Sequence, residues 1–368
     1  MAKSRLHELA ARGQSVWFDT LSRDLVHSGE LKRMMEEDAV TGVTSNPTIF
    51  QKALSSGDAY DEDMKKLLAE TDDPEQIFFS LALQDIRDAC DVLKPAYDAS
   101  NGVDGYVSME VLPSLAYDTE KTFAQARWIA TEVDRPNVYV KIPATVPGLP
   151  AIEDCIAHGT SINITLIFSL DRYKAVVEAY LRGLERLVAG GGDPSTVASV
   201  ASFFVSRVDT EADKRLEAAG HPELQGKLAI ANAKLAYEHF LEAFAGSRWE
   251  YLAGKGATRQ RCLWASTSTK NPAYRDVLYV EELIGPETVN TMPLETIEAF
   301  QDHGEVRGDT VLEGVDEAHE LLRQLEAAGV SYDEIVDTIE AEGVQKFADS
   351  FDQIAESIRA KRGALAAA

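Results

Sequence analysis

One lysine lies inside a stretch of apolar residues. Lys141 interrupts the run Val138-Tyr139-Val140-Lys141-Ile142-Pro143-Ala144, which otherwise has the composition of a buried β-strand. Burial penalises the charged form of a lysine, and a neutral amine is the nucleophile that attacks a ketone to form a Schiff base. A lysine whose ammonium reaches solvent or pairs with a carboxylate is the alternative interpretation. Lys141 is therefore a candidate for carbonyl chemistry.

Other apolar runs also carry single polar residues. Asp19 ends the first run and is a candidate general acid or base, with the N-cap of a helix near Leu25 as the alternative. Glu110 lies within another run, where a carboxylate must find a partner. Asn163 and Thr165 are two residues apart in one run and share a strand face, so they can bind one ligand or hydrogen-bond across strands.

Three further runs end in polar or aromatic residues that complete the candidate site. An anionic substrate needs a local group of cations, because the whole chain has a formal charge of −25. The additional candidates are Asn46, Ser202, Phe204, Arg207, Ser266, Ser268 and Lys270.

Short β-type runs alternate along the chain with helical patterns such as 119–132, 173–188 and 226–244. A strand-helix repeat of this kind predicts a closed parallel (β/α)₈ barrel, or TIM barrel. In such a barrel the catalytic residues lie at the C-terminal ends of the strands, where these polar residues are expected to meet. The predicted strands are 16–19, 40–46, 106–112, 138–144, 162–168, 197–205, 261–267 and 288–292.

Additional helices are predicted outside the barrel repeat. Residues 1–13 have the pattern of an amphipathic helix, and the insertion 47–104 is expected to hold more than one helix, with breaks near Gly57 and Pro74. C-terminal helices within about 313–362 are expected to pack on the barrel.

An apolar stripe at helical spacing runs through the C-terminal segment. Its packing against the barrel is the first interpretation, and a partner or dimer surface is the alternative. We see no linker, so residues 1–368 are predicted to form a single domain. The stripe consists of Val344, Phe347, Phe351, Ile354 and Ile358.

The composition of the chain argues against several kinds of partner and indicates in which compartment the protein is expected. The 61 acidic residues against 36 basic ones argue against nucleic acid or an anionic membrane as a partner. The three cysteines are widely spaced and the seven histidines lack ligand spacing, so neither a disulfide framework nor a metal site is expected. With no signal-peptide pattern and no apolar run near about 18 residues, the expectation is a soluble cytoplasmic protein.

Five motifs in order resemble those of the transaldolase family. They are Thr41-Gly42-Val43-Thr44-Ser45-Asn46-Pro47, Val107-Ser108-Met109-Glu110-Val111, Val140-Lys141-Ile142-Pro143-Ala144, Ile162-Asn163-Ile164-Thr165-Leu166-Ile167-Phe168-Ser169 and Ser202-Phe203-Phe204-Val205-Ser206-Arg207. The resemblance extends from Asp19 to about Met292, and the segment 264–272 is typical of the longer bacterial members.

The resemblance implies a barrel, no cofactor and no metal, and a Schiff base at Lys141. The implied reaction transfers a dihydroxyacetone unit between sedoheptulose 7-phosphate and glyceraldehyde 3-phosphate, giving erythrose 4-phosphate and fructose 6-phosphate, in the non-oxidative pentose phosphate pathway. Glu110, with Thr165 and a water, would relay protons, and Asp19 would exchange a proton with the C4 hydroxyl. Asn46 and Asn163 would hold hydroxyls of the donor.

The phosphate of the substrate is expected at Arg207 with Ser266. Shorter family members have an arginine two residues after that serine, where this chain has Ser268; Lys270 is then the nearest cation and Arg275 the next. The chain also has Phe203 where shorter members have proline.

Two other functions are alternatives to the transaldolase reaction. One is fructose-6-phosphate aldolase, a lyase of the same fold, which needs a donor to protonate the enamine; Phe204 offers no hydroxyl for that purpose. The other is a sugar-phosphate-binding barrel without catalysis. Phosphorylated sugars are the expected partners, and the sequence suits a monomer or a homodimer.

Overall fold

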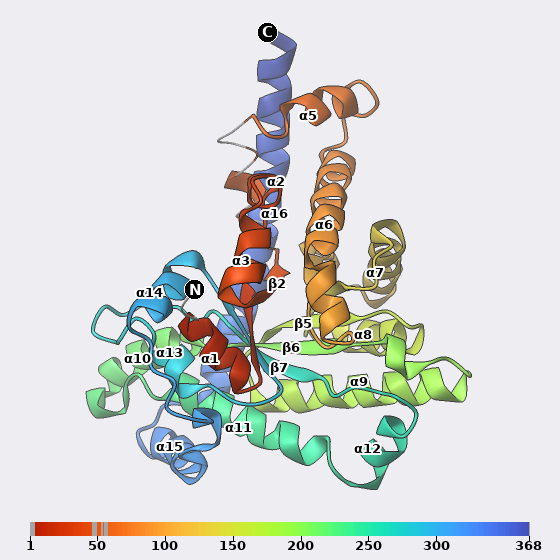
Figure 1. Cartoon of the computed structure of the whole chain (residues 1–368). Coiled ribbons are helices and arrows are strands. Elements are labelled where there is room, and N and C mark those ends of the chain that lie inside the picture. The colour runs from red at the N-terminus through yellow and green to blue at the C-terminus, as the bar shows by residue number, and fades with distance from the viewer. Residues whose placement is uncertain (1–3, 46–49, 53, 55–57, 368) are drawn as a thin grey trace.

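A closed barrel of eight parallel strands forms the centre of the computed structural model, which describes residues 4–45, 50–52, 54 and 58–367 (Figure 1). The strands pair in chain order, and β8 closes the barrel against β1. This confirms the predicted fold, and every predicted strand overlaps an observed one. The strands are β1 (Gln14–Phe18), β2 (Val40–Thr44), β3 (Val107–Glu110), β4 (Val138–Pro143), β5 (Ile162–Ile167), β6 (Ser199–Phe204), β7 (Arg261–Ala265) and β8 (Thr288–Met292).

The barrel strands are buried on both faces, as parallel strands covered by helices must be. In β4 all six residues are buried. Because side chains alternate along a strand, Val140 and Ile142 lie on the opposite face of β4 from Tyr139 and Lys141. Tyr139 packs near Trp17 of β1, with ring centres 6.1 Å apart.

Helices surround the barrel between successive strands. The predicted helices 119–132, 173–188 and 226–244 are confirmed as α7, α9 and α11. Side-chain caps begin two of them, since Asp118 accepts a hydrogen bond from the Lys121 N–H and Ser169 accepts one from the Arg172 N–H. These helices are α7 (Thr119–Val133), α8 (Gly148–Ala157), α9 (Leu170–Ala189), α10 (Ser206–Ala219), α11 (Leu228–Ala243), α12 (Gly246–Ala253), α13 (Leu278–Glu282) and α14 (Leu294–His303).

Further helices lie outside the repeat. The predicted N-terminal helix is present as α1, and the predicted break near Pro74 is the start of α6, capped by Asp73; Gly57 lies outside the described residues. The helices are α1 (Arg5–Ala11), α2 (Arg23–His27), α3 (Glu30–Asp38), α5 (Asp61–Leu68), α6 (Pro74–Ala99), α15 (Val315–Ala327) and α16 (Tyr332–Ala367), with 3₁₀ turns at Pro113–Leu115, Pro194–Thr196, Pro222–Leu224 and Thr310–Leu312.

Helix α16 runs from the barrel to the far end of α6. Its Gly343 lies against the end of β5, where a Cβ atom would come within 3.3 Å of Leu166. Farther along, Phe351 packs edge-to-face on Phe78 of α6, with ring centres 5.2 Å apart. The two helices lie side by side and extend away from the barrel (Figure 1). The mouth of the barrel is therefore bordered by α16.

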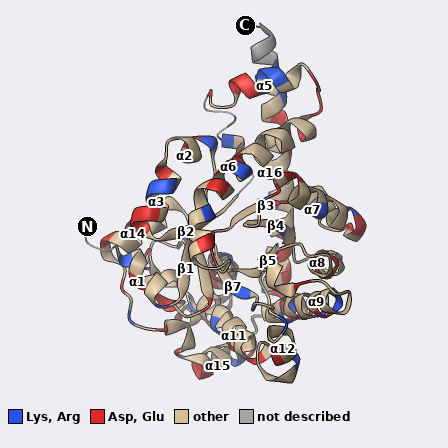
Figure 2. Cartoon of the chain, turned by 45° about the vertical axis from the view of Figure 1, so that its right-hand side comes forward, with Lys and Arg blue, Asp and Glu red and all other residues tan. Residues whose placement is uncertain are grey.

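Charged residues lie mostly on the surrounding helices, whereas the strands are largely uncharged (Figure 2). Within the described residues, no helix is long and apolar enough to cross a membrane.

Candidate functional site

A cavity of about 470 Å³ opens at the C-terminal ends of the strands. All eight strands run in the same direction, so the residues that end them converge there. The strands and the residues directly after them contribute Asp19, Thr44, Lys141, Thr165, Ser202, Phe204, Ala265, Ser266 and Thr291.

Lys141 and Glu110 form a buried ion pair beside the cavity. They are register partners on β4 and β3, and the Lys141 Nζ lies 3.0 Å from Glu110 Oε1. Their side chains are only 8 % and 12 % exposed. The Nζ is also 3.5 Å from the Ser45 carbonyl oxygen, while the Ser45 hydroxyl donates to Glu110. The arrangement pairs the lysine, as the alternative interpretation expects, and also gives its amine a nearby proton acceptor.

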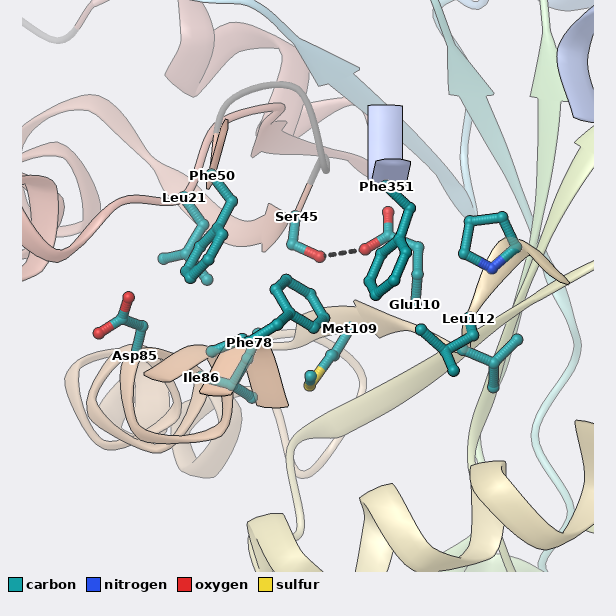
Figure 3. Close-up of a pocket in the computed structure, with 13 residues that line it drawn as sticks. Leu21, Ser45, Phe50, Phe78, Asp85, Ile86, Met109, Glu110, Leu112 and Phe351 are labelled. Atoms are coloured by element: carbon teal, nitrogen blue, oxygen red, sulfur yellow. Dashed lines mark hydrogen bonds between the residues drawn. The ribbon is translucent and has the colours of Figure 1, made fainter. Parts of the chain in front are cut away.

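Glu110 is bordered on its other side by an apolar pocket of about 40 Å³ (Figure 3). Phe50, Phe78, Met109 and Phe351 line this pocket, and the Glu110 carboxylate lies beside Ser45 and the Phe351 ring (Figure 3). Apolar walls keep the local dielectric low, which strengthens the attraction between Glu110 and the ammonium.

Asp19 lies directly after β1 and also borders the cavity. The Thr44 hydroxyl donates to its Oδ1 at 2.6 Å. Burial raises the pKa of Asp19, although the Lys141 charge and the Thr44 hydrogen bond oppose this shift. The helix cap is instead Ser22, which accepts from the Leu25 N–H, so the N-cap alternative for Asp19 is wrong. A carboxyl that keeps its proton more readily than usual suits acid and base catalysis.

The two polar residues of β5 have different surroundings. Thr165 lines the cavity, and its hydroxyl has no hydrogen-bond partner among the described residues. Asn163 is fully buried, donates to the Ser108 hydroxyl at 3.0 Å and accepts from the Ser202 hydroxyl at 2.7 Å. Its amide therefore makes the cross-strand hydrogen bonds of the alternative interpretation, and Ser202 lies between it and the cavity.

The expected phosphate ligands Arg207, Ser266 and Lys270 also line the cavity. Arg207, at the start of α10, has its Cζ 5.0 Å from the centre of the Phe204 ring, and its Nη1 has no partner within the described part of the chain. Burial lowers the pKa of Arg207, and the carboxylates of Asp19 and Glu342 oppose that shift. A guanidinium with unused donors is suited to an anion.

The residues after β7 divide between the cavity and the surface. Ser266 has a positive φ of 58°, and its hydroxyl lies 2.8 Å from that of Ser206. Lys270 lines the cavity and donates to Ser268 at 2.6 Å. Arg275 does not line it and instead pairs with Glu281 at 2.9 Å. Asn46 lies outside the described residues.

Sequence reasoning missed the contribution of α16. The apolar stripe predicted packing, but no local pattern predicted which turn would reach the cavity. Phe347 places its ring centre 5.9 Å from the Lys141 Nζ. The residues of α16 that line the cavity are Ile339, Glu342, Lys346 and Phe347, and α10 adds Thr210 and Glu211.

No group of three or more histidine, cysteine, aspartate or glutamate residues suited to a metal ion occurs in the described ranges.

Comparison with known proteins gives consistent matches along the chain. The family described as "Transaldolase/Fructose-6-phosphate aldolase" matches residues 16–358. A protein named "Transaldolase" from Frankia alni is 52 % identical over 361 residues, covering 97 % of both chains. Proteins of the same name from Acidothermus cellulolyticus and Thermobifida fusca are each 51 % identical, covering 96 % of this chain and 95 % and 97 % of their own lengths.

Proposed function

Since this chain belongs to the transaldolase/fructose-6-phosphate aldolase family, we propose that it transfers dihydroxyacetone between phosphorylated sugars through a Schiff base on Lys141. The donor is sedoheptulose 7-phosphate and the acceptor glyceraldehyde 3-phosphate, giving erythrose 4-phosphate and fructose 6-phosphate. The observation that carries this proposal is the Lys141–Glu110 pair at 3.0 Å, next to a cavity that Asp19 also borders.

The first step joins the donor to the enzyme. Lys141 passes a proton to Glu110, and its neutral amine attacks C2 of the ketose to form a carbinolamine. Glu110, with the Thr165 hydroxyl and a water, then returns a proton to the departing C2 hydroxyl, which leaves as water. The product is a protonated imine on Lys141.

The second step breaks the C3–C4 bond. Asp19 accepts the proton of the C4 hydroxyl, the electron pair of the C3–C4 bond moves into the protonated imine, and the aldehyde product leaves. The enamine remains attached to Lys141. An acceptor aldehyde adds to C3 by the reverse path, with Asp19 returning the proton.

Transfer is favoured over lysis by the lining of the cavity. Release of free dihydroxyacetone requires a proton at C3 of the enamine. Phe204 lines the cavity with an aromatic ring that has no hydroxyl, and its ring lies against Arg207. The fructose-6-phosphate aldolase activity is the second candidate, and a binding barrel without catalysis the third.

The setting of the reaction is part of the same proposal. We propose that residues 1–368 act as one domain in the cytoplasm, as a monomer or a homodimer, with phosphorylated sugars as partners and without nucleic acid or membrane. The charge of −25 supports the last point. Light scattering coupled to size exclusion separates monomer from dimer.

The deciding experiment measures glyceraldehyde 3-phosphate released from fructose 6-phosphate, with and without erythrose 4-phosphate. Release that depends on erythrose 4-phosphate establishes the transferase. Equal release in both cases identifies a lyase, and no release in either leaves only binding.

The nucleophile is tested with Lys141→Arg. Arginine keeps the positive charge beside Glu110 but does not deprotonate to attack a carbonyl. We expect no mass adduct after borohydride treatment with fructose 6-phosphate, whereas the unaltered enzyme gains one. A stable adduct in the variant would assign the Schiff base to another residue.

A further inference from the structure

The turn of α16 that borders the cavity carries a lysine without an assigned role. Lys346 lines the cavity and is exposed, and its ammonium makes no ion pair within the described ranges. Its neighbour Phe347 lies against Lys141, so this turn of α16 faces the reacting end of the site. An unpaired cation beside a substrate cavity is available to a ligand.

The charge balance of the cavity makes this cation significant. The lining residues include as many acidic side chains as cationic ones, and a sugar phosphate brings up to two negative charges at neutral pH. The rest of the protein adds a negative field. Without Lys346 the lining itself would be net negative. The cations are Lys141, Arg207, Lys270 and Lys346, and the acids are Asp19, Glu211, Glu295 and Glu342.

The direction of the helix places Lys346 toward Arg207. Side chains on an α-helix lean over the preceding turn, so Lys346 extends over the turn that contains Glu342. The Glu342 carboxylate acts electrostatically on Arg207. The turn of α16 that contains Glu342 is therefore close to Lys346 and to Arg207.

The other candidate cations, Arg275 and Lys270, are less available than Lys346 to bind a phosphate. Arg275 is held by both carboxylate oxygens of Glu281, at 2.9 and 3.0 Å, and does not line the cavity. Lys270 does line it, but its ammonium donates to the Ser268 hydroxyl. Among the described residues, the Lys346 ammonium has no such partner to release.

We propose that Lys346 binds the phosphate of the substrate together with Arg207, so that α16 supplies a phosphate ligand as well as packing. This inference rests on the proposed function, because it assumes that the cavity binds sugar phosphates. It makes Lys346 a determinant of preference for phosphorylated over unphosphorylated sugars.

The test compares Lys346→Met with Lys346→Arg and with the control Arg359→Met. Arg359 is an exposed cation on the same helix, about 20 Å farther along, and does not line the cavity. The donors are fructose 6-phosphate and fructose, with D-erythrose as the unphosphorylated acceptor, so that only the donor differs in phosphate and both reactions form sedoheptulose. Dissociation of inorganic phosphate is measured by calorimetry on the same four proteins.

We expect Lys346→Met to raise KM for fructose 6-phosphate about tenfold, because losing one charge-assisted hydrogen bond weakens binding by about that factor. The kcat should change less than about twofold. The Kd of inorganic phosphate rises in parallel, and kcat/KM for fructose stays unchanged. Lys346→Arg restores most of the loss, and Arg359→Met matches the unaltered enzyme.

Two outcomes overturn the inference. One is an unchanged KM and phosphate Kd in Lys346→Met, and the other is an equal loss with fructose and fructose 6-phosphate, which marks a structural effect. If the unaltered enzyme turns over neither donor, the proposed function fails, while the phosphate Kd still decides whether Lys346 is a ligand.

Discussion

At the scale of single residues, the site separates two carboxylates by their surroundings. Glu110 is paired with the ammonium of Lys141, whereas Asp19 receives a neutral hydrogen bond from Thr44 and has its pKa raised by burial. A carboxylate held by a cation is suited to proton exchange with the amine. A carboxyl with a raised pKa is suited to exchange with a substrate hydroxyl.

Replacing Asp19 by asparagine is expected to separate activity from stability. Because burial raises the folded-state pKa, the stabilising contribution of this carboxyl is present below its usual pKa of 3.8 and is lost as pH rises through the folded value. At pH 7 the charged form therefore costs stability, and Asp19→Asn removes that cost while keeping an acceptor for Thr44. We expect kcat to fall at least about 100-fold, with an unfolding free energy equal or higher.

Urea unfolding and initial rates at pH 7 measure the two quantities on the same preparations. A variant that unfolds more easily than the unaltered protein would contradict the burial argument. Retained activity would remove Asp19 from the mechanism.

At the scale of elements, α10 holds Arg207 in place through an internal anchor. Asp209, two residues later, accepts hydrogen bonds from the Tyr279 hydroxyl at 2.8 Å and from the Ala229 N–H at 2.7 Å. These contacts connect α10 to α11 and α13. Burial raises the pKa of Asp209 to about 7, against the opposing effect of both hydrogen bonds.

The anchor predicts a pH-dependent stability. The folded state binds the Asp209 proton more tightly than the unfolded chain, so stability from this group is full below pH 3.8 and is lost as pH rises to about 7. Asparagine cannot titrate; its Oδ1 can still accept from the Ala229 N–H, and its Nδ2 can donate to the Tyr279 hydroxyl oxygen. We expect Asp209→Asn to be more stable than the unaltered protein at pH 8 by about 2–4 kcal/mol.

Denaturant titrations at pH 5 and pH 8 test this, because the difference between the two proteins must grow with pH. The same difference at both pH values would show that Asp209 is charged throughout. The variant Glu217→Gln, at an exposed position on the same helix, controls for loss of an acidic residue.

At the scale of the whole molecule, the three cysteines are free and buried in the folded chain. Burial raises the pKa of Cys155 and of Cys262 to about 12, and that of Cys90 further. Thiolate is the reactive form, so the folded protein should resist thiol reagents. We expect Ellman's reagent at pH 8 to titrate essentially no thiol in the native enzyme and all three in denaturant.

Rapid labelling of one thiol in the native protein would show local opening at that cysteine. If substrate slows this labelling, the local opening involves the active site. If substrate leaves the labelling rate unchanged, the opening is independent of the active site.

Much of the barrel could be predicted because its signals are local. Each strand, from β1 to β8, is a short apolar run between helical patterns, and burial of parallel strands on both faces requires that composition. The polar residues at strand ends then converge by topology alone, which is how Asp19, Lys141 and Thr165 could be grouped before their distances were known.

Which of the candidate residues reach the cavity depended on contacts between residues distant in sequence. Whether Asn163 faced the cavity or its neighbouring strands depended on Ser108 and Ser202, which are distant in sequence. Arg275 and Lys270 both follow Ser266 closely in the sequence and were both candidate phosphate ligands. Only the folded structure shows that Arg275 is paired with Glu281.

The sequence by itself determined the barrel and the family, and it predicted Lys141 as the nucleophile, because apolar periodicity and strand-end residues are local properties of the chain. Only the tertiary structure decided that α16 borders the cavity with Phe347 and Lys346. The physical reason is that an amphipathic stripe specifies that a helix buries one face, but the surface it covers depends on the shape of the whole barrel.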